Sequence, residues 1–228
     1  MSEIYSEKFL RNPLTKKQQE KIRKARFAIV GLGGTGGFIL ENLLRVGAED
    51  FVVFDNDRFE LSNFNRQTLA TEDFLDMPKT DAAFRRAKAV NSGIRLERAG
   101  LFCPGSDLRG ADILLDGADN ISTKLAMARE ARKRKIPYVF ASAQDTRGIV
   151  SVFRGYRFEK AFQVPPDEER LAQYSLCSSI ICPAASLAGT LAAQQAINIL
   201  IRKPFVKAPD ALFFDLFRKE IFWRGKLG

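Results

Sequence analysis

Polar side chains that could bind a nucleotide crowd one short stretch of the chain, residues 54–67, which reads FDNDRFELSNFNRQ. Asp55, at its start, follows an apolar run and could accept hydrogen bonds from the hydroxyl groups of a ribose. Arg66, near its end, and Lys79, farther along, are permanent or nearly permanent cations that are suited to holding phosphates. Asp116 and Asp119, in the later run DGADN, follow the end of an apolar strand, where a carboxylate that faces phosphates could hold Mg²⁺. These residue types predict a site for a nucleoside triphosphate.

A glycine-rich turn precedes this stretch. Residues 31–37 read GLGGTGG and lie between a run typical of a strand and an amphipathic pattern typical of a helix. Glycine permits a tight turn and a close approach of the backbone to a phosphate. The helix that follows would offer unpaired N–H groups and the positive end of its dipole to an anion. Together with Asp55, this turn predicts an adenine nucleotide, although these features alone fit NAD as well as ATP.

The residue inventory excludes several classes of enzyme. The chain has 228 residues, no histidine and three cysteines, which are Cys103, Cys177 and Cys182. Without histidine, Ser-His-Asp and Cys-His catalysis and the HExxH zinc motif are impossible. An odd number of cysteines with no CxxC pair indicates a reducing compartment and leaves too few soft ligands for a structural zinc ion. We therefore expect a cytoplasmic protein without zinc.

Positive charge is concentrated at the two ends of the chain. The formal net charge is +9, of which residues 1–26 contribute +5 and residues 202–228 contribute +4. Basic ends suit an acidic protein partner or a nucleotide, whereas nucleic-acid binding is not expected because no interleaved aromatic motif is present. Residues 171–201 carry no charge, but they include Pro183 and many polar or small side chains. This composition favours a helix packed inside the protein over a membrane span.

Patterns typical of strands and of helices alternate along most of the chain. Residues 26–47 are expected to form a strand, the glycine turn and then a helix closed by Gly47, and further strands are expected in the ranges 50–55, 94–102, 111–120, 136–144, 147–155 and 210–225. Further helices are expected in the ranges 14–25, 79–93 and 122–135 and near Pro183, with a loop over 156–177. This order predicts an α/β fold with a doubly wound, mainly parallel sheet and antiparallel C-terminal strands. We expect a basic helical lead-in over residues 1–25 and a single domain over residues 26–228.

Four motifs together resemble the ThiF/MoeB/HesA family of adenylyltransferases, which are related to ubiquitin-activating enzymes. They read GLGGTG, DNDRFELSNFNRQ, MPK and DGADN here, with Phe64 in place of the leucine that is usual in the second motif. The resemblance covers about residues 5–200 and implies a Rossmann-like, ATP-binding fold. Many relatives carry two zinc-binding CxxC pairs, which this chain lacks, so it resembles a short member without zinc.

The resemblance implies a task for each matching residue. Asp55 would bind the ribose, and Asp119 would bind Mg²⁺. Asn63, Arg66 and Lys79 would hold the triphosphate, while the role of Asp57 is left open. The full set expected to contact the nucleotide is Gly31, Gly33, Gly34, Gly36, Asp55, Asp57, Asn63, Arg66, Gln67, Lys79, Asp119 and Asn120.

The implied reaction is the attack of a carboxylate on the α-phosphorus of ATP, which yields an acyl-adenylate and pyrophosphate. A carboxylate is already ionised at pH 7, so the reaction needs no general base. Catalysis would then come from positioning and from charge neutralisation by Arg66, Lys79 and the metal ion. A chain without histidine is compatible with that chemistry.

Two further residues are given a role by the resemblance. Some relatives use a cysteine of the crossover loop for a thioester or acyl-persulfide step, and Cys177 occupies that region. Cys182, directly before Pro183 at an expected helix start, is the alternative nucleophile, and a buried, inert thiol is the competing interpretation for both. Arg11 resembles an arginine that crosses a two-fold interface to reach the partner subunit's phosphates, which would make the protein a homodimer.

The nature of the substrate stays open at this level. One hypothesis is the C-terminal glycine of a small ubiquitin-like sulfur carrier of the ThiS or MoaD type, since such carriers are commonly acidic. A second is a small-molecule or peptide carboxylate in cofactor or natural-product biosynthesis. A nicotinamide oxidoreductase is disfavoured because it would need only Asp55 from the second motif. A non-catalytic partner subunit is disfavoured by the intact Arg66, Lys79 and Asp119.

Overall fold

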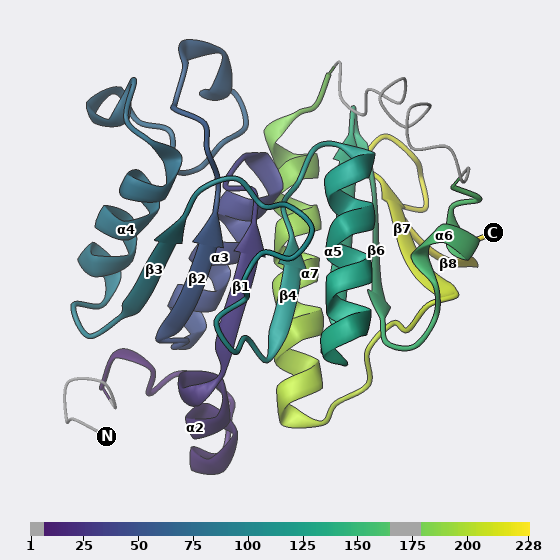
Figure 1. Cartoon of the computed structure of the whole chain (residues 1–228), viewed down its shortest axis with the longest axis horizontal. Coiled ribbons are helices and arrows are strands. Elements are labelled where there is room, and N and C mark those ends of the chain that lie inside the picture. Colours follow the sequence, from purple (N-terminus) through teal and green to yellow (C-terminus); the bar gives the residue numbers. More distant parts are fainter. Residues whose placement is uncertain (1–6, 165–178) are drawn as a thin grey trace.

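The computed structural model describes residues 7–164 and 179–228 as one eight-stranded sheet with helices on both faces (Figure 1). The strands are β1 (Arg26–Val30), β2 (Asp50–Phe54), β3 (Arg95–Ala99), β4 (Ile113–Asp116), β5 (Tyr138–Gln144), β6 (Arg147–Phe153), β7 (Asp210–Asp215) and β8 (Phe222–Lys226). The helices are α2 (Lys16–Lys24), α3 (Gly34–Val46), α4 (Lys79–Val90), α5 (Ile121–Arg134), α6 (Phe158–Ala161) and α7 (Cys182–Ile201), with short 3-10 turns at Leu61–Asn63 and Glu72–Phe74.

The strand order is β3-β2-β1-β4-β5-β6-β7-β8. The first five strands in this order run parallel, and β6, β7 and β8 continue the sheet antiparallel. The predicted α/β architecture with antiparallel C-terminal strands is therefore confirmed. Chain order reverses between β1 and β4, and an open sheet of this kind binds ligands at such a point, outside the carboxyl ends of its strands.

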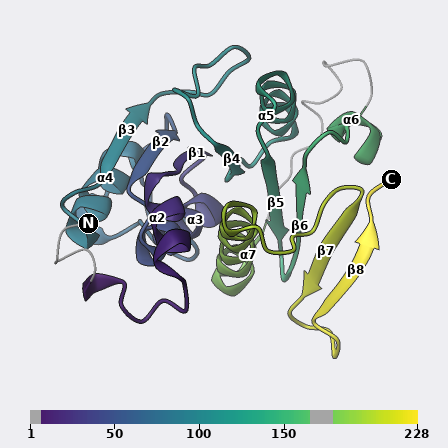
Figure 2. The same ribbon diagram turned by 90° about the horizontal axis from the view of Figure 1, so that it is seen from below.

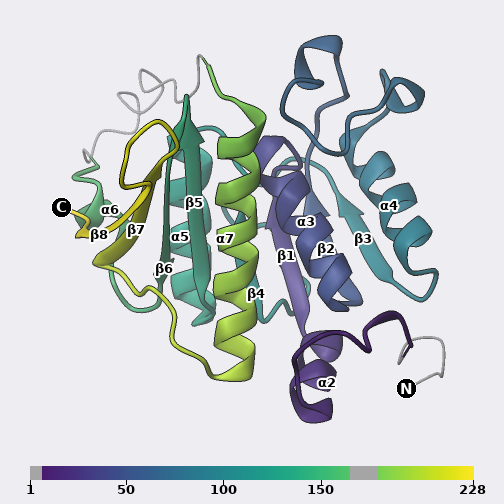
Figure 3. The ribbon, with the colours of Figure 1, turned by 180° about the vertical axis from the view of Figure 1, so that it is seen from behind.

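Two apolar layers sandwich the sheet. On one face, α3, α4 and α7 pack on side chains such as Phe27, Ile29 and Val53, whereas α5 and α6 pack on the opposite face. Figure 2 shows the sheet from below with α5 and α7 on opposite sides, and Figure 3 shows α3 and α7 side by side across the rear face. Strands β1, β2 and β4 are buried on both faces, which explains their continuous apolar sequence.

Local sequence accounts for most helix boundaries. Thr15 and Gln18 form a capping box at the start of α2, and Gly47 ends α3 in the left-handed conformation at φ 97°. The expectation of a continuous loop over 156–177 was wrong at α6. Phe158 and Ala161 are buried there against the layer that contains Tyr138, so tertiary packing stabilises a turn too short to show helical periodicity.

Helix α7 is the uncharged helix expected near Pro183. It is long and apolar enough to cross a membrane by length and composition alone. It packs along α3, where a Cβ on Gly189 would lie 2.5 Å from the carbonyl oxygen of Thr35. Its buried face consists largely of alanine, including Ala185, Ala188 and Ala192, which lets the two helices approach closely. This packing is that of a core helix.

Candidate nucleotide-binding site

A cavity of about 330 Å³ opens at the carboxyl ends of β1, β2 and β4, the upper edge of the sheet in Figure 1. Such a volume is at the lower end of the range typical of small-molecule sites. The expected residues that line it are Gly31, Gly33, Gly34, Asp55, Asp57, Arg66, Gln67, Lys79, Asp119 and Asn120. The four sequence motifs, separated by up to about ninety positions, therefore meet at one place.

The glycine turn presents a helix N-terminus to the cavity. Gly33 is the N-cap of α3 and provides no side-chain hydrogen bond, so the first N–H groups of the helix remain available to an anion. Gly31 has φ 83°, a conformation that L side chains rarely adopt. A Cβ on Gly117 would lie 2.3 Å from the carbonyl oxygen of Gly31, so the DGADN turn packs backbone to backbone against the glycine turn.

Asp55 connects the glycine turn to the end of β2. Its Oδ2 accepts a hydrogen bond from the Leu32 amide at 2.7 Å, and its Oδ1 accepts one from the Asp57 amide at 2.8 Å. Burial raises the pKa of the Asp55 carboxyl, although the nearby Lys79 charge and these two amides oppose the shift. Each carboxylate oxygen retains a second lone pair, so the side chain can still accept from a ribose hydroxyl.

Lys79 is the first residue of α4 and is nearly buried, with its side chain 8% exposed. Its ammonium group contacts the Asp57 carboxylate at 3.0 Å, and its backbone N–H donates to the Asp57 carbonyl at 2.9 Å. The aromatic ring of Phe59 lies 6.0 Å from the same ammonium. Asp57, whose role the sequence left open, thus holds Lys79 at the cavity wall.

The SNFNRQ segment contributes three of its residues to the cavity. Arg66 donates through Nη1 to the Ser62 carbonyl and to Asn65 Oδ1, both at 2.8 Å, and its guanidinium group brings a positive charge to the cavity wall. Gln67 is 6% exposed, and within the described residues its buried Oε1 has no hydrogen-bond partner. A buried amide oxygen without a donor is costly, so this atom offers an acceptor to a ligand.

Asp119 lies on the exposed wall of the cavity, at the N-terminus of α5. Asn120 caps this helix by accepting from the Thr123 amide at 2.8 Å and donates to Asp119 Oδ1 at 3.2 Å. No three potential metal ligands converge within residues 7–164 and 179–228. A lone carboxylate nevertheless fits Mg²⁺, which is commonly held by one or two carboxylates together with substrate phosphates and water.

Three expected residues, Gly36, Asn63 and Arg11, are not brought to the cavity within the part of the chain that the structure describes. Gly36 is buried behind it, where a Cβ would meet the Gly31 carbonyl. Asn63 uses its amide within the 3-10 turn, accepting from Glu60 and donating to Ser62, while the neighbouring Asn65 lines the cavity instead. Cys177 lies outside the described residues.

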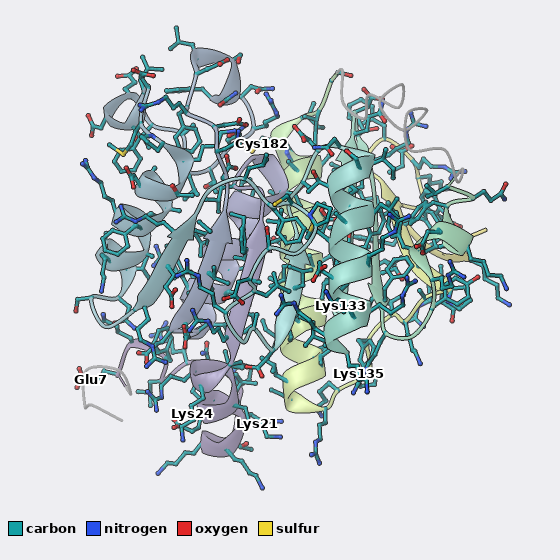
Figure 4. All side chains as sticks on the ribbon, viewed as in Figure 1. Glu7, Lys21, Lys24, Lys133, Lys135 and Cys182 are labelled. Carbon is teal, nitrogen blue, oxygen red and sulfur yellow. The ribbon has the colours of Figure 1, made fainter. Side chains whose placement is uncertain are left out.

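Arg11 lies at the opposite end of the molecule from the cavity. Its neighbours in the chain, Lys8 and Asn12, donate to the carbonyls of Val90 and Val46, at the C-terminal ends of α4 and α3. Both helices start at the cavity, and α3 alone spans about 20 Å at 1.5 Å per residue. Arg11 therefore does not reach the cavity of its own chain. In Figure 4, Lys21 and Lys24 of α2 lie at that lower end, and Cys182 lies at the upper end.

Sequence reasoning placed Asp116 with Asp119 as a carboxylate that could face phosphates, but the structure buries Asp116 in a charged cluster whose Lys124 lines the cavity, a pairing that the sequence did not predict. Asp116 and Lys124 are 0% and 2% exposed and form an ion pair of 2.9 Å, and Tyr138 donates to the same carboxylate at 2.5 Å. Burial raises the pKa of the Asp116 carboxyl despite the Lys124 charge, and burial beside that carboxylate raises the pKa of Tyr138. The sequence feature that could have indicated this ion pair is the spacing of eight residues between Asp116, at the end of a strand, and Lys124, in the first turns of the next helix.

Known proteins are similar to this chain in sequence. The ThiF family profile matches residues 5–225. The sulfur carrier protein ThiS adenylyltransferase of Bacillus subtilis is 33% identical over 155 residues, which are 65% of this chain and 46% of that protein. The molybdopterin-synthase adenylyltransferase of Haemophilus influenzae is 28% identical over 192 residues, which are 81% of this chain and 78% of that protein.

Solved structures share the fold. PaaA superposes with a TM-score of 0.81 at 19% identity, over 100% of this chain and 75% of its own. Escherichia coli MccB, crystallised with ATP, superposes with a TM-score of 0.76 at 20% identity, over 92% of this chain and 66% of its own. At these identities the likeness concerns the fold.

Proposed function

The chain belongs to the ThiF family, and from that premise we propose that it is an adenylyltransferase that uses ATP to activate a carboxylate. One observation carries the proposal. Asp55, Lys79, Asp119 and the N-terminus of α3 line a single cavity, although they come from four separate motifs. They supply a ribose acceptor, a cation, a metal-binding carboxylate and an anion-binding helix end, which together match MgATP.

The residues have distinct roles in the proposed reaction. Asp55 accepts from the ribose, and Gln67 Oε1 accepts from a nucleotide donor group. Lys79 and Arg66 neutralise the phosphates, together with the N–H groups of α3. Asp119 is the carboxylate that would hold Mg²⁺, which would supply further neutralisation of negative charge on the phosphates.

The chemical step transfers the adenylyl group. A substrate carboxylate oxygen forms a bond to the α-phosphorus, the bond from that phosphorus to the bridging oxygen breaks, and pyrophosphate leaves with the electron pair. The nucleophile is ionised near pH 7, so no proton has to be removed. The developing charge lies on the leaving pyrophosphate, where Lys79 and Arg66 can stabilise it. Positioning and electrostatics therefore account for the reaction in a chain without histidine.

We propose the C-terminal carboxylate of a small sulfur-carrier protein as the substrate. The support is that the curated relatives are named as adenylyltransferases of such carriers. The formal charge of +9 favours an acidic protein partner. A peptide carboxylate is the second candidate, because the similar fold of MccB was crystallised with MccA. We propose a cytoplasmic enzyme that works without a membrane or nucleic acid.

We further propose a homodimer in which Arg11 acts in trans. Arg11 lies far from its own cavity, so a catalytic role for it would have to be played at the site of a partner subunit. Mixing the inactive variants Arg11→Ala and Asp119→Ala should restore part of the activity, because each mixed dimer contains one intact composite site. If the mixture stays inactive while subunits demonstrably exchange, Arg11 has no role in trans.

The test of the function is ATP–pyrophosphate exchange with purified carrier proteins that end in Gly-Gly, with short peptides as the alternative substrates. Exchange should require both Mg²⁺ and a substrate carboxylate. Asp119→Asn should abolish it, whereas Asp73→Asn, a matched change at an exposed carboxylate outside the cavity, should not. Tight NADH binding without ATP binding would instead indicate an oxidoreductase and refute the proposal.

A further inference from the structure

We propose that the buried pair Asp116–Lys124, completed by Tyr138, positions the DGADN turn so that Asp119 can bind the metal ion of MgATP. Lys124 and Asp116 are thus positioning residues for the site. The inference rests on the proposed function, since it concerns the same nucleotide. It gives a specific task to three side chains without an assigned nucleotide contact, of which Lys124 also lines the cavity.

The pair joins three elements next to the cavity, whose wall includes Lys124. Lys124, on the first turns of α5, donates to Asp116 Oδ1 at the end of β4 and to the carbonyl oxygen of Ala141 in β5 at 3.0 Å. Tyr138, also on β5, donates to the other carboxylate oxygen. The ring of Phe140 lies 5.3 Å from the Lys124 ammonium and covers it. Each oxygen of the Asp116 carboxylate therefore accepts a hydrogen bond from a side chain, Oδ1 from Lys124 and Oδ2 from Tyr138.

Asp116 transmits this restraint to the turn. Its Oδ1 also accepts from the Ala118 amide at 3.0 Å, while the Gly117 amide donates to the Val30 carbonyl at 2.7 Å. The next residue is Asp119, which the Asn120 cap holds from the other side. Asp119 thus lies between two anchors, one at Asp116 and one at the start of α5, although its own carboxylate is exposed.

Stability alone does not explain a buried ion pair at this place. Removing two charges from water is expensive, and well-packed apolar side chains of similar size are often equally or more stabilising. What apolar residues cannot supply is a set of directional donors that holds the turn. Since the turn packs against the glycine turn at Gly117, the same restraint reaches the phosphate-binding N-terminus of α3.

The experiment measures the dissociation constant of ATP by calorimetry with Mg²⁺ and with EDTA. The ratio, which is the dissociation constant in EDTA divided by the dissociation constant with Mg²⁺, reports how well Asp119 is placed for the metal ion. In Lys124→Met the ratio should shrink at least 10-fold and approach that of Asp119→Asn. Lys133→Met removes an exposed lysine from the same helix and should leave the ratio at the wild-type value.

Thermal unfolding of each variant separates positioning from stability. Lys124→Met leaves a buried carboxylate without its cation and could fail to fold. The triple variant Asp116→Leu/Lys124→Met/Tyr138→Phe removes the charges and the hydroxyl together, so it should fold while still lacking the wild-type ratio. A folded variant of either kind that keeps the wild-type ratio overturns the inference.

The remaining outcomes are also decisive. If neither variant folds, the cluster is a structural element of the core and the positioning role is wrong. If the wild-type protein binds no ATP, the proposed function fails and this inference fails with it. If the wild type shows a Mg²⁺-dependent affinity that Lys124→Met retains, only the inference fails.

Discussion

Gly117→Ala is expected to separate the two turns that form the nucleotide site. A Cβ at this position would lie 2.3 Å from the Gly31 carbonyl oxygen and 2.7 Å from Gly36 Cα, where ordinary contact begins at 3.4 Å. These neighbours are backbone atoms that cannot rotate away, so one turn must move by about 1 Å. Overpacking of this kind costs about 1–3 kcal/mol.

The two consequences of Gly117→Ala can be measured separately. At about 2–4 °C per kcal/mol for a domain of this size, the melting temperature should fall by roughly 2–12 °C. A displacement of about 1 Å in a ligand site can cost on the order of 100-fold in function, so ATP binding should weaken about 10–100-fold, or roughly 1.4–2.7 kcal/mol. Thermal unfolding and calorimetric titration with ATP give the two values.

Gly100→Ala is the matched control. Gly100 follows β3, is exposed, and has no atom within 4 Å of the position of an added Cβ. This change should alter stability by less than about 1 kcal/mol and leave the affinity for ATP unchanged. If Gly117→Ala matches Gly100→Ala in both measurements, the close packing of the two turns has no energetic importance and the reasoning is refuted.

Three further predictions concern single side chains. Asp119→Asn should remove the Mg²⁺ dependence of ATP binding with little change in melting temperature, because the side chain is exposed, and a large fall in that temperature would contradict this. Lys79→Met should weaken ATP binding at least 10-fold, whereas Asp57→Asn should weaken it less, and titration of both variants tests that order. Hydrogen bonding to Arg23 lowers the pKa of Glu20 to about 2, so this carboxylate stabilises the folded state above about pH 4.5 and the effect is lost as the pH falls toward 2. Unfolding of Glu20→Gln across that range should show a flatter acid dependence than the wild type, and identical profiles would exclude the contribution.

Local pattern was enough to predict most of the elements, α6 being an exception, and the order of the motifs. The apolar run before Gly31, the capping residues of α2 and Gly47 after α3 act within a few positions of the chain, so their effects can be read without a fold. The parallel sheet followed from the alternation of strands and helices, because a parallel pair requires a crossover. Its carboxyl edge then located the cavity, with Asp55 and Lys79 in its wall.

Contacts between distant segments were decided only by tertiary structure. Asn63 and Asn65 are two positions apart, and local sequence does not distinguish them. In the structure, the Asn63 side chain forms hydrogen bonds with Glu60 and Ser62 within the 3-10 turn, whereas Asn65 lines the cavity. Lys124 looks like one more cation on a basic helix, and only the packing of α5 on β4 and β5 buries it against Asp116. Burial and partnership depend on which faces meet, and that is a property of the assembled sheet and helices rather than of any one segment.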